Sequence, residues 1–571
     1  MKKIALVSLL IAGLFSSSIS ANAATEDEQW PFPNTYQAGH HSVLLVDSAD
    51  WITDFSYLQI ENDKGRFLCT SLNDPKCATG DWTKYQALLP KCTASSDTDC
   101  IEGISAILPD GKVIDGSFNK YIYGGNHPNK YTGDGIQIPA NPSEPSLWNL
   151  VGAEHAFGSE YAIAVGLAGG AKLGGTTRNI SDFYIRLSPV SELPTSNGVK
   201  DVNGYANYPF CQEINQPGSK PTTGCGSGAQ EYGQYRCAFK MVENATCLLQ
   251  HAFPEGVRFK VAIRMKTEPN GMFHGRLSNP AITVDTTSTG TRITVEAGSV
   301  KVPSLYYGDY WNNLSQELKD YWTNCLAQGT CRWGTRNPQN PVAVPEQRNL
   351  YEIPDAYGDH AMSLIGTYSK YVDDTSVAAP SLWSMRLLSA DQMGSANQCF
   401  RTKQGFLGVV NTNSTTYSAG PPTFDDGFLN YKVASLHYLP NKEVFKGSYS
   451  LILRSDVARC IYGFSSAPVS ASVQVLSADG SNQVATTVVD EKENYLYLRA
   501  EGFTFSAPTI KVKLSQAAAL TPTATPTVTA SPNASTAPSA TKVSINCVKG
   551  KVKKTVKGFN PKCPAGYKKA A

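Results

Sequence analysis

The sequence predicts a mainly β protein. Glycine (47 residues) and proline (34) are frequent in a chain of 571 residues, and β-branched and aromatic residues are spread evenly along it. Short runs of alternating polarity stand between turn-type residues; in Val257–Lys266, apolar and polar positions alternate, as in a half-buried strand. Short strands at this spacing favour a sandwich or an open barrel. We therefore expect tandem β-sandwich-like domains with a small N-terminal β region, a short helical connector and a disordered linker before a basic tail.

The first 23 residues have the pattern of a signal peptide. Lys2 and Lys3 precede the apolar stretch Ile4–Phe15, which is short for a transmembrane helix, and Ala21–Ala23 supplies small residues at a cleavage site. The alternative is an ordinary core helix, which these flanks disfavour. No later stretch is apolar for long enough to span a bilayer. We therefore expect a secreted or cell-surface protein.

The chain divides by composition and by an internal match. Four landmarks, Gly158, Gly166, Phe183 and Arg186, recur 200 positions later as Gly358, Gly366, Trp383 and Arg386. Further matches pair His251 with His437, Arg264 with Arg454, Gly275 with Gly463, and Cys211 with Cys399. We interpret this as a tandem duplication of one β domain, with a period too long for a solenoid. The expected parts are 1–23 (signal peptide), 24–141 (β-rich region), 142–300 (repeat A), 301–350 (connector), 351–516 (repeat B), 517–541 (Thr/Pro/Ala/Ser linker) and 542–571 (basic tail).

Local patterns predict several elements. Leu108–Ile114 contains Asp-Gly between apolar residues and is a hairpin candidate. Strands are also expected after Pro468 and over Tyr495–Arg499. Apolar residues from Trp311 to Cys325 fall at helical spacing, with Gly329 as a stop, and predict a connector helix buried against a neighbour rather than a ligand platform.

The fourteen cysteines predict disulfides in an oxidising compartment. None is in the Cys-x-x-Cys spacing of a structural zinc site, so no metal or other cofactor is expected. Connectivity is not fixed by sequence, but pairing of nearest neighbours would place a bridge in each region. The candidates are Cys69, Cys77, Cys92, Cys100, Cys211, Cys225, Cys237, Cys247, Cys325, Cys331, Cys399, Cys460, Cys547 and Cys563.

Charge is divided between the body and the tail. Residues 542–571 contain nine lysines and no acid, while the body after the signal peptide has a net charge of about −9. This division predicts that the tail meets a polyanion such as an anionic envelope polymer, and it makes nucleic acid a poor partner for the body. The candidate binding residues are Lys549, Lys551, Lys553, Lys554, Lys557, Lys562, Lys568 and Lys569.

Two segments carry a resemblance. Gly447–Phe464 and the tail pattern of Cys547 followed by Cys563-Pro-Ala-Gly-Tyr-Lys-Lys resemble uncharacterised secreted proteins of actinobacteria, over about the C-terminal third of the chain. The resemblance implies a shared export or surface-retention tail on varied passenger domains. It carries over no catalytic residue.

No reaction is indicated by a motif. His251 and His437 recur, but neither has a nucleophile in a recognisable elbow, so a buried, hydrogen-bonded histidine is the favoured interpretation. Asp373–Asp374 and Asp425–Asp426 match either the acid pair of a glycoside hydrolase or solvated turn acids. Glu154–His155 and Asp359–His360 lie at shifted positions, which weakens a metal-site interpretation, and Arg186 and Arg386 are expected to cap strands.

Tyrosines, densest over 306–311, favour packing, with carbohydrate stacking as the alternative. We expect a secreted, envelope-associated binding or structural protein without catalytic activity, retained by its basic tail. The alternative is a secreted hydrolase acting on polysaccharide.

Overall fold

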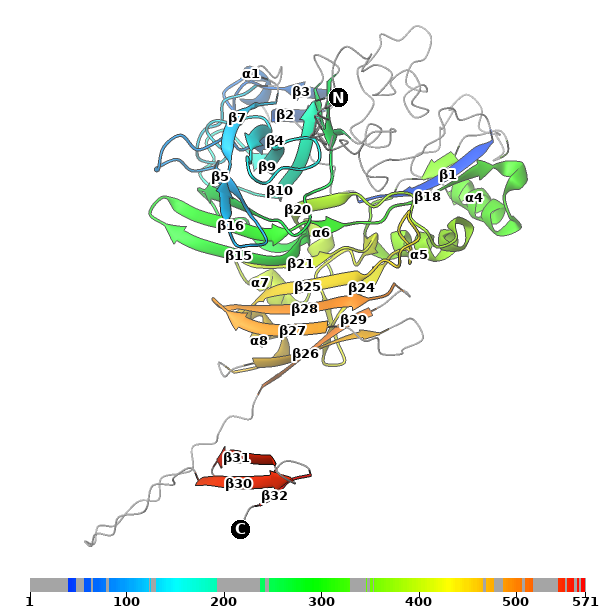
Figure 1. Ribbon diagram of the computed structural model, residues 1–571. Coiled ribbons are helices and arrows are strands. Elements are labelled where there is room, and N and C mark those ends of the chain that lie inside the picture. The colour runs from blue at the N-terminus through cyan, green and yellow to red at the C-terminus, as the bar shows by residue number, and fades with distance from the viewer. Residues whose placement is uncertain are drawn as a thin grey trace, which may run out of the picture. The chain divides into compact units, whose positions relative to one another are not determined.

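The computed structural model describes most of the chain and divides it into two compact units, Met1–Ala517 and Ala518–Ala571. The mainly β class is confirmed, since strands dominate both units (Figure 1). The described residues are 39–47, 56–62, 65–78, 82–122, 124, 130–192, 237–241, 246–328, 346, 350–352, 354–465, 469–476, 486–505, 509–516, 543–549, 552–558, 562–563 and 566–569.

The larger unit is organised around one long, mostly antiparallel sheet, in which β14 and β21 are parallel neighbours. Its main path runs through β27 (Thr486–Lys492), β28 (Tyr495–Phe503), β25 (Gly447–Arg454), β21 (Phe406–Thr412), β14 (Gly271–Arg276), β20 (Ser381–Leu387), β10 (Asp182–Glu192), β9 (Glu160–Ala171), β4 (Thr83–Leu88), β2 (Tyr57–Asn62) and β3 (Gly65–Leu68). Further strands belong to the same sheet but lie off its main path: β7 (Ser117–Tyr121), β8 (Ser146–Asn149), β11 (Cys237–Met241), β12 (Thr246–Gln250) and β17 (Val300–Lys301).

Two five-stranded sheets share cores with the long sheet. One has the order β15 (Ser278–Thr287), β16 (Gly290–Gly298), β13 (Arg258–Met265), β5 (Cys100–Ile107) and β6 (Val113–Asp115). The other has the order β22 (Thr416–Tyr417), β24 (Phe428–Ala434), β29 (Thr509–Gln516) and β26 (Val469–Leu476), with β23 (Thr423–Asp425) on β24.

The central strands are buried on both faces. Successive side chains of a strand point to opposite faces. In β14, Phe273 therefore packs into the core that the sheet of β13 shares, and Met272 into the core that the sheet of β24 shares. In β21, Val409 and Val410 divide in the same way. The result is two sandwich-like cores on opposite faces of a common sheet.

A small α/β lobe contains the predicted connector helix. Its sheet has the order β18 (Leu305–Tyr310), β1 (His40–Leu45) and β19 (Leu350–Glu352), and it packs against α4 (Gln316–Gln328) and α5 (Gly358–Tyr368). Leu318 and Trp322 of α4 are fully buried, which confirms the helix read from their spacing and its buried interpretation.

The remaining helices in the described part of the chain are short. They are α1 (Pro75–Ala78), α6 (Ala390–Met393), α7 (Gln398–Thr402) and α8 (Ser455–Tyr462), with single 3-10 turns at Trp311–Asn313 and Ser369–Val372. A capping box starts α6, in which the Ser389 hydroxyl accepts from the Gln392 N–H and the Gln392 side chain accepts from the Ser389 N–H. No described helix is long and apolar enough to cross a membrane.

The local strand predictions are confirmed. The chain turns between β5 and β6 at Gly111, whose φ of 86° is the positive value for which Asp-Gly is suited. The alternating run from Val257 forms β13, and the other two expected strands form β26 and β28.

The internal match does not correspond to one repeated local structure. Gly166 lies within strand β9, whereas Gly366 lies within helix α5. Gly275 is buried in β14, whereas Gly463 ends α8 in the left-handed conformation. These landmarks are therefore not equivalent positions of two superposable domains. Matched glycines therefore have different structural causes. Gly275 allows a close approach within the sheet, whereas Gly463 ends a helix.

Arg186 and Arg386 correct a second expectation. They do not cap strands: Arg186 lies inside β10 and Arg386 inside β20, and these strands are antiparallel neighbours. Tyr184 pairs with Arg386, and Arg186 pairs with Ser384, so the matched residues lie in one sheet. The expected region 24–141 also contributes strands to three different sheets.

Where the structure describes both partners, four disulfides join nearest neighbours in the sequence: Cys69–Cys77, Cys92–Cys100, Cys399–Cys460 and Cys547–Cys563. Cys325 is also disulfide-bonded, and no cysteine among the described residues is free. Cys237 and Cys247 lie in β11 and β12, but their side chains are not described. Cys211, Cys225, Cys331, the expected signal peptide and the expected linker lie outside the described residues.

Candidate functional site

The C-terminal unit is a small disulfide-closed sheet. Its strands, β30 (Val543–Lys549), β31 (Val552–Gly558) and β32 (Lys568–Lys569), have the order β31-β30-β32. The Cys547–Cys563 disulfide closes a separation of 16 residues, and Cys547 is fully buried. A unit this small has little apolar core, so a disulfide is the expected source of its stability.

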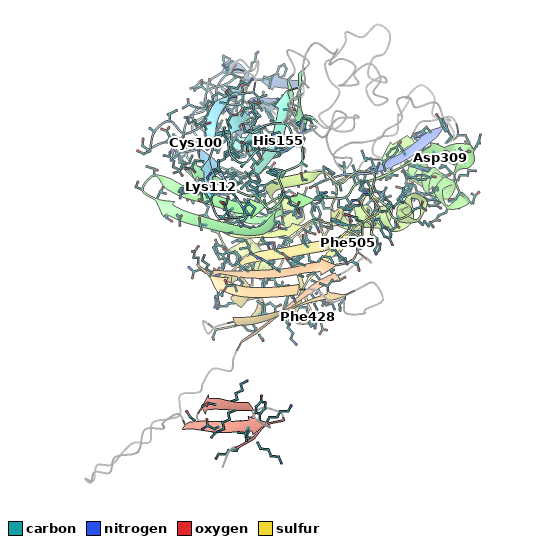
Figure 2. The ribbon with its side chains drawn as sticks, in the orientation of Figure 1. Cys100, Lys112, His155, Asp309, Phe428 and Phe505 are labelled. Atoms are coloured by element: carbon teal, nitrogen blue, oxygen red, sulfur yellow. A yellow bond between two sulfur atoms is a disulfide. The ribbon has the colours of Figure 1, made fainter. Side chains whose placement is uncertain are left out.

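Both faces of this sheet carry lysines. Lys554 and Lys569 stand opposite Cys547 on its two neighbouring strands, and Lys553 and Lys568 stand opposite Val548. Since Cys547 and Val548 are adjacent in one strand, the two rows point to opposite faces. Figure 2 shows side chains radiating from this unit.

Exposure agrees with this register. Six predicted binding residues are exposed: Lys549, Lys553, Lys554, Lys562, Lys568 and Lys569. Lys557 belongs to β31 but its side chain is not described, and Lys551 lies outside the described residues. Because residues 542–571 contain no Asp or Glu, the tail itself offers no side-chain carboxylate to neutralise these ammonium groups. The arrangement is a compact, multivalent cation that can contact a polymer from either face.

His251 is buried, as expected from sequence, with 2% of its surface exposed. Its Nε2 and the Ser191 hydroxyl are 2.7 Å apart, and its ring stacks with those of Phe157 and His155. Burial, and for His251 also the neighbouring His155, lowers the pKa of both histidines to about 4. The neutral forms are therefore the stable ones at pH 7.

His437 has a different environment from His251. It is about one-third exposed, and both its backbone N–H and its Nδ1 contact the Asp374 carboxylate, the former at 3.0 Å. The two recurring histidines therefore do not share a common environment.

The acidic pairs lie in separate turns. Asp373 and Asp374 follow a 3-10 turn with positive φ values of 50° and 52°, and Asp426 has a φ of 47° between β23 and β24. This geometry supports turn residues over the acid pair of a glycoside hydrolase.

The two Glu/Asp–His dipeptides also separate. The Glu154 carboxylate accepts from the Gly152 N–H, while His155 is buried. Asp359 is exposed beside Lys432, whereas His360 contacts Glu352. No group of three metal-ligating side chains occurs in the part of the chain that the structure describes.

The tyrosine-rich run forms β18. Tyr307 packs against Tyr368 and Tyr371 with ring centroids 5.4 and 5.5 Å apart, which supports the packing interpretation. Tyr310 is the more exposed, beside His40 at 5.2 Å.

Sequence reasoning missed a buried ion pair. The Arg276 Nε donates to Asp47 at 2.5 Å, and both side chains are almost completely buried. Arg276 also donates to the carbonyl oxygens of Thr412 and Ser414. No local signal links residues so far apart in the sequence.

Comparison of the chain with models of protein families, with curated proteins and with solved structures finds no match.

Proposed function

We propose that this is a secreted, envelope-attached binding protein, which its C-terminal unit anchors to an anionic polymer. The observation that carries the proposal is the set of exposed lysines on both faces of a disulfide-closed sheet. The body is acidic overall, with a net charge of about −9, and a polyanion would repel it. Attachment is therefore assigned to the tail alone.

The physical basis is multivalent electrostatics. Each lysine is a compact, hydrated point charge that suits phosphate or carboxylate groups without demanding one geometry. A polymer that accepts several such contacts releases its condensed counterions, and binding then falls steeply as salt rises. The disulfide contributes by keeping the charges together, which lowers the entropy lost on binding.

The experiment compares two triple variants in the full chain. One replaces tail lysines (K553Q/K554Q/K568Q), and the matched control replaces exposed body lysines (K370Q/K432Q/K492Q), whose side chains are 54%, 62% and 67% exposed. Retention is measured on phosphocellulose and on isolated envelopes of the producing cells across a salt series. The tail variant should lower the slope of log affinity against log salt by roughly 2 units, while the control should leave it unchanged.

Mass spectrometry without reduction confirms that the tail variant keeps the Cys547–Cys563 bond. Equal retention of the two triple variants would contradict the proposal. The proposal would also be contradicted if a chain lacking residues 542–571 were retained on envelopes at low salt as well as the intact chain.

A further inference from the structure

A polar cavity of about 590 Å³ opens on the larger unit. It lies between the disulfide-closed loop that follows Cys92, the ring of Tyr121, the segment from Gly135 to Asn141, and the end of β13. Its volume is in the range of sites that hold small organic ligands. The lining residues are Pro90, Lys91, Thr93, Ser96, Asp97, Thr98, Asp99, Cys100, Tyr121, Gly135, Ala140, Asn141, Lys266 and Thr289.

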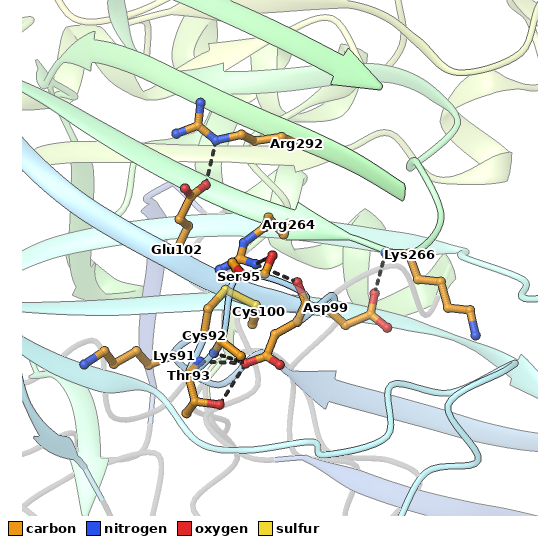
Figure 3. The surroundings of a disulfide bond; sticks show 12 residues. Lys91, Cys92, Thr93, Ser95, Asp99, Cys100, Glu102, Arg264, Lys266 and Arg292 are labelled. Carbon is orange, nitrogen blue, oxygen red and sulfur yellow. Dashed lines mark hydrogen bonds and ion pairs between the residues drawn. A yellow bond between two sulfur atoms is a disulfide. The ribbon is translucent and has the colours of Figure 1, made fainter. Parts of the chain in front are cut away.

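The loop that forms one wall is held in place before any ligand arrives. The Cys92–Cys100 disulfide closes it, and the Arg264 guanidinium on β13 donates to the carbonyl oxygens of Ser95 and Asp97 (Figure 3). At its end, Asp99 forms a buried ion pair with Arg178 at 2.6 Å. A wall fixed by these contacts loses little entropy on binding.

The charged groups of the cavity already have partners within the protein. Asp97 accepts from the N–H groups of Ala94 and Thr93, both at 2.7 Å, and from the Thr93 hydroxyl, and these bonds lower its pKa. The Lys266 ammonium donates to the Gly135 carbonyl, and that of Lys91 lies 5.2 Å from the centre of the Phe118 ring.

The uncharged polar groups that remain on the lining are the hydroxyls of Ser96, Thr98 and Thr289 and the amide of Asn141. Hydroxyls and amides both donate and accept hydrogen bonds. Such a lining is complementary to a neutral ligand that carries many hydroxyl groups.

Tyr121 also lines a second cavity. The smaller cavity, of about 170 Å³, has Tyr121 as a shared wall and is otherwise lined by Ser56, Lys130, Tyr131, Pro142, Ser143 and Glu144. The Tyr121 hydroxyl accepts from the Lys91 N–H at 3.2 Å, which fixes the ring. An aromatic ring that lines two compartments can stack on the apolar face of one sugar unit while the compartments hold its neighbours.

We infer that this two-compartment cleft binds a neutral oligosaccharide, with Tyr121 under one sugar unit. The inference is independent of the tail, since every residue that carries it lies in the larger unit.

The test titrates the full chain with soluble pentasaccharides of glucose, xylose and N-acetylglucosamine, using calorimetry and saturation-transfer NMR. At least one should bind at millimolar concentration or below. Tyr121→Ala should weaken that binding about tenfold, and Tyr121→Phe, which keeps the ring, should retain most of it. Asn141→Ala should also weaken binding.

Trp82→Ala is the matched control, because this indole is 50% exposed yet lies on the lining of neither cavity. Near-UV circular dichroism checks that each variant keeps its fold. The inference is overturned if no pentasaccharide of the panel binds the wild type, or if Tyr121→Ala binds as well as the wild type. An equal loss in Trp82→Ala would also overturn it.

Discussion

At the scale of single residues, burial decides the chemistry of the histidines. His155 and His251 stack on each other, so a proton on either would be held near the other ring in a poorly solvated site. The sequence correctly predicted that His251 is buried and hydrogen-bonded. It could not predict Ser191 or His155 as its partners, because these contacts join strand ends and loops that only the sheet brings together.

This pair predicts a loss of stability in acid. Both folded-state pKa values, about 4, lie below the ordinary 6.5, so the unfolded chain takes up protons first as pH falls. The stabilisation is fully present above pH 6.5 and is lost between pH 6.5 and 4, by at most about 1.4 kcal/mol per pH unit for each histidine. Urea unfolding at several pH values should show a shallower decline for His251→Gln. Identical pH profiles for the variant and wild type would contradict the pair's role.

At the scale of elements, alternation of apolar and polar residues correctly predicted strands in which one face is more polar than the other. The run that forms β13 has the period of two that predicted it. The run that forms β14 shows no alternation, because both of its faces are buried and a strand covered on two sides has no polar row. The three-layer packing was therefore invisible in the pattern.

Helix α5 shows a conflict between two signals. Ala361, Leu364, Ile365 and Tyr368 have helical spacing and all are buried. The glycine match assigned the same segment to a β repeat. The spacing of apolar residues indicates directly which face of a segment is buried. A matched glycine indicates only that a small residue is needed at that position. The apolar spacing is therefore the better predictor of secondary structure in this segment.

Removing different disulfides should destabilise the protein by different amounts. Cys399–Cys460 joins α7 to α8 across a separation of 61 residues, whereas Cys69–Cys77 spans only 8. In the chain-entropy model, the longer loop restricts the unfolded chain more, by about 4 against about 2.5 kcal/mol. Thermal unfolding should therefore show a larger fall in midpoint for C399S/C460S than for C69S/C77S. A larger fall for the short loop would count against this ordering.

At the scale of the whole molecule, the tail was predictable and the cleft was not. Nine lysines without an acid can be read from thirty consecutive residues. The cleft is lined by segments from residue 56 to residue 289, and only the fold places them around Tyr121.

The division into two units predicts independent stability. Removing residues 518–571 should leave the unfolding temperature of the body unchanged, because Met1–Ala517 forms a compact unit of its own. Differential scanning calorimetry of the intact and shortened chains measures this directly. A shift of several degrees in the body's transition would show that the units stabilise each other.

The first described strand has its partners very late in the chain. His40 of β1 pairs with Tyr310 of β18, and His41 pairs with Leu350 of β19. During synthesis, the segment that becomes β1 therefore emerges long before either neighbour exists. Pairing of such distant segments makes folding slow. Until it pairs, an apolar segment with free backbone N–H and C=O groups can mispair or aggregate. The α/β lobe of β1, β18 and β19 therefore cannot form until both late strands have been synthesised. Of the described parts of the fold, we expect this lobe to misfold first when the chain folds too early or at high concentration.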